Sequence, residues 1–228
     1  MIGQYPVTQD LYEAVVRKIP NAKYPTPSKG KSDTLTAGET QGLRPVECVD
    51  FFEVATFCNK LSELQGLEPV FTINGDTVTA DITKNGWRIP TEAEWEYAAR
   101  GRTADDGTKD LFAGAKDVND VVNYAWVKAN SNGVTHEVGL KKPNARGLYD
   151  MLGNVYEWCL DLYSTIKVTD WEYVENPTGA TTGTERVQRG SSKGSSSSIT
   201  TTTRDKGEQT KYWNDVGFRL CRTLGQYK

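Results

Sequence analysis

The chain has 228 residues, enough to bury one hydrophobic core, and 25% of them are charged, as in ordinary globular proteins. Its net charge of -3 provides no basic field for nucleic acid or an anionic membrane, so we expect no nucleic-acid partner. We find no apolar run long enough to span a bilayer, and the first ten residues lack the apolar core of a signal peptide.

The helices expected in the first half of the chain are marked by spacing and capping. Apolar residues at helical spacing predict a short amphipathic helix over residues 9–17. Capping boxes at Asp50 and Thr91 begin two more helices, which end at Gly66 and Gly101. The last helix carries three acids that could be mistaken for catalytic carboxylates, but the helix dipole explains their place in its first turns more simply. They are Glu92, Glu94 and Glu96.

Glycine and proline mark the segments between these helices. Residues 20–46 hold four prolines and three glycines and are expected to form a long loop. Asn74-Gly75, between two short β-prone runs, predicts a hairpin with a tight turn at these two residues. Residues 102–146 are rich in Asp, Asn, Gly and Lys, and we expect mostly loop there.

The four cysteines and the single histidine limit the redox and metal chemistry open to the chain. His136 would have to serve any catalytic triad, and because it lies in a polar segment we expect it at the surface. The cysteines are far apart, have apolar neighbours and form no Cys-x-x-Cys pair, which predicts buried free thiols. They are Cys48, Cys58, Cys159 and Cys221.

Residues 147–158 combine a glycine-containing turn with a strand. Alternation places Tyr156 and Trp158 on one side of the strand and Glu157 on the other. A carboxylate near Asp150 and glycine-freed carbonyls has the oxygen-rich chemistry of a calcium site, although the spacing by itself favours a structural turn.

A Ser/Thr tract near the C-terminus has the most unusual composition of the chain. Ten of the thirteen residues in 191–203 are Ser or Thr, which alone would indicate a disordered linker or a solvated loop. However, Val187 precedes the tract, and Val216, Phe218 and Leu220 alternate after it as a half-buried strand. A polar segment held between two core strands presents its small side chains outward, so a binding surface is the alternative to a plain loop.

Seven segments match one protein family in chain order: 6–8, 45–47, 58–62, 88–101, 147–158, 189–190 and 217–219, the last with the letters Gly-Phe-Arg. Together they resemble the formylglycine-generating (sulfatase-modifying factor) family. The resemblance covers nearly the whole chain. It implies a single domain over residues 1–228 with an α+β, loop-rich, C-type-lectin-like fold.

Members of the family that this chain resembles differ in their activity. The oxidase members carry two active cysteines whose positions, counted from Arg189, fall on about Ser195 and Thr200 here. Neither residue supplies a thiolate, so we expect no copper and no thiol redox chemistry. Iron-dependent relatives need several histidines, and this chain has one. We therefore expect a protein that is not an enzyme, with an oxidase of altered or lost chemistry as the alternative.

The chain also resembles the variable proteins of diversity-generating retroelements, which display a hypervariable C-terminal surface on a lectin-like scaffold. Adenine substitution, often in Asn codons, produces residues of the kinds that fill the variable region, about 189–222. The resemblance implies a receptor- or adhesin-like protein that binds an unknown protein or glycan, with a ligand-free structural domain as a further possibility. The expected ligand-binding residues are Ser195, Ser197, Ser198, Thr201, Thr203, Asp205, Thr210, Tyr212, Trp213 and Asn214.

The family resemblance further implies a structural calcium site on the side chains of Asp150 and Glu157 and the backbone oxygens of Gly153 and Val155. From the role of such receptors we expect the full-length protein at the cell surface or outside the cell, although these residues contain no export signal. We expect a monomer.

Overall fold

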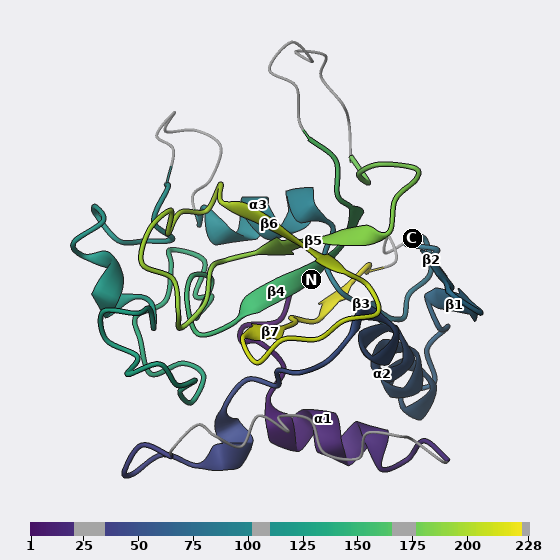
Figure 1. Ribbon diagram of the computed structural model, residues 1–228. Coiled ribbons are helices and arrows are strands. Elements are labelled where there is room, and N and C mark those ends of the chain that lie inside the picture. The colour runs from purple at the N-terminus through teal and green to yellow at the C-terminus, as the bar shows by residue number, and fades with distance from the viewer. Residues whose placement is uncertain (21–34, 102–109, 166–176, 225–228) are drawn as a thin grey trace.

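A computed structural model describes residues 1–20, 35–101, 110–165 and 177–224 (Figure 1). The predicted loops 20–46 and 102–146 lie partly outside these residues. The helices are α1 (Gln9–Val16), α2 (Phe51–Leu64) and α3 (Glu92–Ala99), with two 3-10 turns, η1 (Gln41–Leu43) and η2 (Val121–Asn123). The strands are β1 (Phe71–Asn74), β2 (Thr77–Ala80), β3 (Trp87–Arg88), β4 (Tyr156–Leu162), β5 (Glu185–Arg189), β6 (Arg204–Glu208), β7 (Val216–Gly217) and β8 (Cys221–Arg222).

Each helix begins after a capping side chain, and the two predicted caps, Asp50 and Thr91, are both present. The Thr8 hydroxyl accepts from the backbone N–H of Leu11 ahead of α1. Both predicted capping boxes are complete: Asp50 exchanges hydrogen bonds with Glu53 at 2.8 and 3.0 Å. Thr91 and the third residue of α3 do the same at 3.2 and 2.9 Å. These caps satisfy N–H groups that a helix leaves free, and each typically contributes about 1 kcal/mol.

The predicted hairpin is present, but its turn lies one residue further along. Asn74 pairs with Thr77, so the two turn residues are Gly75 and Asp76. Gly75 has a φ of +55°, which glycine adopts without the strain that a β-carbon adds.

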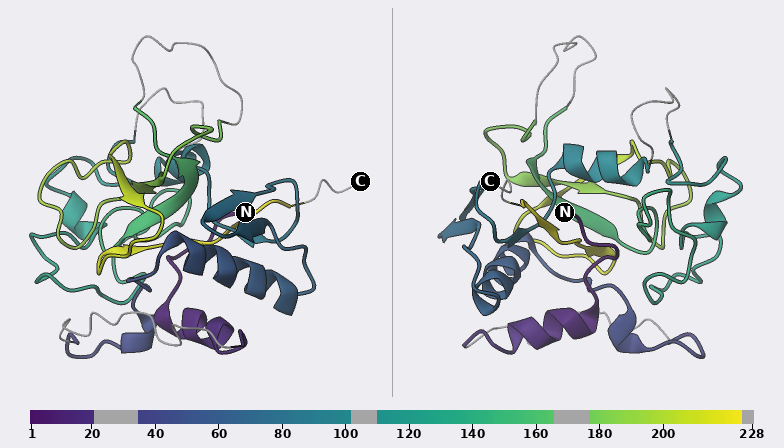
Figure 2. Two further views of the ribbon diagram at one scale, coloured as in Figure 1. Left: turned by 45° about the vertical axis from the view of Figure 1, so that its right-hand side comes forward. Right: turned by 180° about the vertical axis from the view of Figure 1, so that it is seen from behind.

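The central sheet has the strand order β6-β5-β4-β7 (Figures 1 and 2). The pairs β6–β5 and β5–β4 are antiparallel, whereas β7 runs parallel to β4. β3 pairs with β8, and Ile2 forms a bridge to Cys221, which brings the start of the chain beside its last strand. This mixed, loop-rich arrangement of helices and strands confirms the predicted α+β class.

Buried side chains gather in two hydrophobic clusters on the two sides of β4. Trp158 belongs to the cluster that includes α1 and α2, and Trp95 of α3 belongs to the other. Val216, Phe218 and Leu220 all enter the first cluster, as their alternation predicts. The prediction that this strand is half-buried is wrong, because the residues between them are buried as well. The polar one, Arg219, is neutralised by an internal carboxylate described below.

The cysteine prediction is confirmed for three of the four residues, and the histidine prediction is wrong. Cys58, Cys159 and Cys221 are buried free thiols, whereas Cys48, also outside any disulfide, is half-buried. His136 is only 2% exposed. Its ring stacks on Trp126 with centroids 3.8 Å apart, and its Nδ1 lies 2.7 Å from a carboxylate oxygen of Glu39. Glu39 comes from a distant segment, so the local polar sequence gave no sign of this burial.

Candidate functional site

The Ser/Thr tract begins where β5 ends, at a buried arginine. The Arg189 guanidinium is fully buried and donates to Glu92 Oε1 at 2.8 Å and Glu96 Oε2 at 2.6 Å. It also donates to the backbone oxygen of Thr201 at 2.5 Å. One side chain thus joins the start of the tract, helix α3 and the middle of the tract. Two of the three acids that the sequence assigned to the helix dipole, Glu92 and Glu96, also pair with this cation.

The first residues of the tract form a tight, buried turn. Gly190 has a φ of +95°, and a β-carbon there would lie 3.0 Å from both the Met151 carbonyl oxygen and the Trp95 ring, so glycine is required. The Ser192 hydroxyl donates to Asp215 Oδ2 at 2.8 Å, which links the beginning of the tract to the segment that leaves it. These residues are scaffold, although their composition matches the rest of the tract.

Thr201 holds the middle of the tract to the protein interior. Its side chain is fully buried, and its hydroxyl donates to the Asp110 carbonyl oxygen at 2.8 Å. Its backbone N–H donates to the Leu111 carbonyl oxygen, also at 2.8 Å. The sequence placed Thr201 among the ligand-binding residues, but here it has no exposed surface to offer a ligand. Nothing in a run of four threonines distinguishes it from its neighbours.

Most of the other expected ligand-binding residues do reach the surface. In Figure 1 the tract forms the yellow-green loops that lead from β5 to β6. Ser195 and Thr203 are half-buried, and the Thr203 hydroxyl donates to the Ser198 carbonyl oxygen. The exposed members are Ser197, Ser198, Asp205, Thr210, Tyr212, Trp213 and Asn214.

The aromatic part of this surface rests on the core. Trp213 is 37% exposed, yet its ring lies 5.9 Å, centroid to centroid, from the buried Trp158. Its carbonyl oxygen accepts from the Cys48 N–H at 2.9 Å. A β-carbon at Gly207 of β6 would lie 2.8 Å from both indoles, so Trp213 can pack here only because residue 207 is a glycine. Trp213 is therefore a held side chain with one accessible face.

Tyr156 on β4 is a surface residue that sequence reasoning did not assign to the site. It is half-buried, and its hydroxyl lies 3.5 Å from Ser195 Oγ. Burial raises the pKa of this phenol, and the charges of Asp205 and Asp215 raise it further. The hydroxyl thus lies beneath the tract with two carboxylates nearby. The alternation of β4 placed Tyr156 on the side of Trp158, but only the fold shows that the tract covers this position.

The tract provides no thiol at the two positions where the family resemblance implies active cysteines, about Ser195 and Thr200. Burial raises the pKa of the Cys58 and Cys159 thiols, and it raises that of Cys221 to about 11. A thiol with so high a pKa stays protonated at neutral pH and is a poor nucleophile and metal ligand.

The expected calcium ligands fit a cation only in part. Both oxygens of the buried Glu157 carboxylate accept from Arg219, at 2.8 and 3.1 Å, and one also accepts from Trp95 Nε1 at 2.7 Å. Asp150 is the better ligand, because its Oδ1 is buried without a hydrogen-bond partner. Burial raises the pKa of Asp150 to about 6. No group of three His, Cys, Asp or Glu side chains suited to a metal occurs within the part of the chain that the structure describes.

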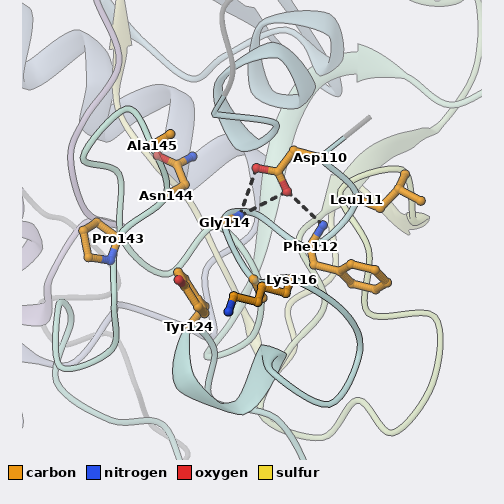
Figure 3. A pocket seen from close by; sticks show the side chains of 10 residues that line it. Asp110, Leu111, Phe112, Gly114, Lys116, Tyr124, Pro143, Asn144 and Ala145 are labelled. Atoms are coloured by element: carbon orange, nitrogen blue, oxygen red, sulfur yellow. Dashed lines mark hydrogen bonds between the residues drawn. The ribbon is translucent and has the colours of Figure 1, made fainter. Parts of the chain in front are cut away.

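A cavity of about 450 Å³ is lined by Asp110 and Leu111, the two residues whose carbonyl oxygens accept hydrogen bonds from Thr201 (Figure 3). Tyr124 and Phe112 contribute aromatic walls. The Asp110 carboxylate accepts from the backbone N–H groups of Phe112 and Gly114 (dashed lines in Figure 3), at 3.0 to 3.2 Å. Because these bonds close the local loop, the carboxylate serves the backbone that supports Thr201.

The fold and these motifs place the chain in a known class: residues 1–224 match the family model of the sulfatase-modifying factor enzyme 1-like domain, and the chain belongs to that family. Within the class, it is similar to the solved Treponema denticola variable protein 1, with a TM-score of 0.84 and 38% identity over 97% of this chain and 84% of that one. The expected likeness to both the formylglycine-generating family and a variable protein is thereby confirmed. The CarF crystal structure, at 24% identity and a TM-score of 0.71, shares the fold.

The curated relatives include a protein named as a chaperone and others named as enzymes. The chaperone protein LppX of Paenibacillus barcinonensis is 31% identical over 72% of this chain and 62% of its own length. The formylglycine-generating enzyme of Thermomonospora curvata is 34% identical over 54% of this chain and 44% of its own length. The chain thus spans less than two thirds of either relative. No helix within the described ranges is long and apolar enough to cross a membrane.

Proposed function

We propose that this chain is a ligand-binding protein of the receptor or adhesin kind, without enzymatic activity of its own. Its ligand contacts the exposed side chains between residues 195 and 214. One observation carries the proposal: a tract of chemically similar residues is divided into buried anchors, such as Thr201, and exposed positions, such as Ser197. Anchors of this kind let neighbouring side chains change while the backbone keeps its path.

The chemistry of the surface suits a protein or glycan ligand. Serine and threonine hydroxyls donate and accept hydrogen bonds adaptably, and aromatic rings add rigid contact area at small entropic cost, as in antibody paratopes. Tyr212, which is 55% exposed, and Trp213 provide that area beside the hydroxyl-rich tract. The likeness to a solved variable protein supports the same interpretation.

Sequencing the DNA that encodes residues 189–222 in several isolates, beside any near-identical genomic copy, tests whether a retroelement diversifies this surface. We expect substitutions at adenines of that copy, in the codons of exposed positions such as Ser197 and Asp205. The codon of the buried Thr201 should stay constant, because a new side chain there has no space. An invariant tract without a second copy would contradict diversification.

Replacing exposed and half-buried residues of the tract separates a binding surface from a purely structural domain. We expect exchanges at Ser195, Ser197 and Thr203 to change which ligands are captured while the melting temperature stays the same. If such exchanges unfold the protein, the tract is structural and the binding proposal is wrong. The Thr202 position, exposed in the same loop, provides a further site for exchange.

An oxidase with altered chemistry is the second candidate, since relatives named formylglycine-generating enzyme share 34 to 36% identity with the chain. Incubation of the protein with copper and a cysteine-containing sulfatase peptide decides between them. We expect no formylglycine, because Ser195 and Thr200 stand where the oxidases carry thiols. Product formation that depends on the protein would overturn the non-enzymatic proposal.

We further propose a monomer displayed at the cell surface or outside the cell. The molecular mass in solution, measured by light scattering, tests the first part; a mass of two chains would refute it. Digestion by an added protease in intact cells tests the second, and protection from that protease would refute it.

A further inference from the structure

A second hollow is lined by residues of the β1–β2 hairpin, β4 and β5. In Figure 1 the hairpin lies at the right of the sheet. Its volume is about 290 Å³, at the small end of the range for ligand pockets. Phe51, Phe71 and Val78 are buried side chains that give it an apolar floor. Thr79 and Ala80 form an exposed rim. None of the exposed tract residues lines it.

Among the described residues, one charged side chain lines this hollow. Arg186 is 9% exposed and donates to the carbonyl oxygens of Leu160 at 2.5 Å and Val78 at 2.8 Å. Its Nε lies 3.4 Å from the Gln209 side-chain oxygen. A guanidinium has five N–H donors, so three neutral acceptors leave two donors for another group. The Phe51 ring, 4.2 Å from the guanidinium carbon, covers one face.

Arg186 differs from the other buried arginines of the described ranges. Arg88, Arg189 and Arg219 each form an ion pair with a carboxylate at 2.6 to 2.8 Å. Arg44 lies 3.6 Å from Glu39. Arg186 alone among them has no carboxylate within ion-pair distance in the described structure. A buried cation normally needs such a partner, because transfer of charge out of water is costly.

Burial lowers the pKa of the Arg186 guanidinium to about 10, and the negative charge of Asp161 offsets part of this effect. Asp161 is itself engaged, since its Oδ2 accepts from the Glu92 backbone N–H at 2.6 Å. Burial raises the pKa of Asp161 to about 6, so its negative charge is held less readily than that of an ordinary aspartate. The guanidinium therefore keeps an attraction for a further anion.

We propose that this hollow binds a small amphiphilic carboxylate, with its apolar body against Phe51, Phe71 and Val78 and its carboxylate on the free donors of Arg186. An apolar floor beside one unpaired cation is the complement of such an acid. The acid can be a free fatty acid of medium chain length or the C-terminal carboxylate of an apolar peptide. The site is separate from the tract surface and does not depend on its function.

Calorimetric titration with octanoate and with 1-octanol tests the proposal. Octanoate should bind saturably, and octanol at least about tenfold more weakly, because it lacks the charge-assisted pair with the guanidinium. A short peptide that ends in a free leucine carboxylate, compared with its amide, distinguishes the two sources of the acid. Equal affinities for octanoate and octanol, or no saturable binding of octanoate or the peptide, would overturn the proposal.

Two variants locate the site. Arg186→Gln should abolish the preference for octanoate over octanol. Because this change also removes donors to two carbonyl groups, Ala80→Trp provides an independent test: it fills the rim without touching the arginine and should reduce octanoate affinity at least about tenfold. Arg222→Gln is the matched control, since Arg222 also donates to a backbone oxygen and lies over an aromatic ring, that of Trp87, but does not line the hollow. Unchanged binding by Ala80→Trp would place octanoate elsewhere and refute the site.

Discussion

Replacing the hydroxyl of the central anchor, Thr201→Val, tests the division of the tract into anchors and display positions. Valine keeps the shape of the side chain and removes the bond to the Asp110 carbonyl oxygen, which measures 2.8 Å. Since Thr201 is fully buried, no water replaces the lost donor. The carbonyl is left without that hydrogen bond in the interior.

The cost of this change follows from the burial. An unsatisfied buried polar group destabilises a protein by about 1–3 kcal/mol. For a domain of this size, 1 kcal/mol shifts the melting temperature by about 2–4 °C. We therefore expect Thr201→Val to lower the melting temperature by about 4–8 °C at a loss of about 2 kcal/mol.

Thr202→Val is the matched control, one residue along. Thr202 is exposed, and within the described residues its hydroxyl shares a hydrogen bond with that of Thr200 alone, at 3.0 Å. The same chemical change there should stay within about 0.5 kcal/mol of the parent protein. Calorimetry or circular dichroism melts of the three proteins provide the comparison. Equal melting temperatures for the two variants would refute the assignment of Thr201 as an anchor.

Three further predictions concern buried charge. Glu157→Gln leaves Arg219 without its buried partner and should cost about 3–5 kcal/mol in urea unfolding, whereas Glu63→Gln, in the exposed pair with Lys60, should cost about 1 kcal/mol or less; similar losses would contradict the burial argument. Burial, with the charges of Glu92 and Glu94, raises the pKa of Asp161 from 3.8 to about 6, so the folded state binds more protons between these values and stability falls as pH rises through them. In denaturant unfolding at pH 7, the free energy of unfolding of Asp161→Asn should therefore exceed that of the parent by about 2–3 kcal/mol, and the difference should disappear near pH 4. The same difference at both pH values would exclude titration of Asp161 as the cause. We expect calcium at millimolar concentration to raise the melting temperature relative to chelator, because it stabilises only the folded state, and Asp150→Ala to abolish the rise; equal melting temperatures with calcium and chelator would remove the calcium proposal.

Local sequence determines the elements of this fold better than it determines which residues are buried. Asp50 and Thr91 mark their helices because capping depends on residues three positions apart. The predicted hairpin turn, Asn74-Gly75, lies one residue too early, because the pairing of Asn74 with Thr77 depends on the register between two strands. His136 was misjudged because its partners, Glu39 and Trp126, approach only in the folded chain.

The same limit applies to the candidate site. Composition indicated the tract, and the family motifs indicated its place between two core strands. Neither could separate Thr201 from Thr202, because the difference lies in contacts with Asp110 and Leu111, about ninety residues earlier in the chain. Nor did Arg186 stand out in the sequence: its unusual lack of a carboxylate partner appears only when the other buried arginines are compared in three dimensions.

The seat of Trp213 above Trp158 also gives this surface an optical signal of its own. Two indoles whose centroids are 5.9 Å apart couple strongly in the ultraviolet, and here one is fully buried while the other is 37% exposed. A molecule that covers the exposed ring changes its solvent and its angle to the buried one. Near-ultraviolet circular dichroism and tryptophan fluorescence can therefore screen for unlabelled ligands, with the protein acting as its own sensor.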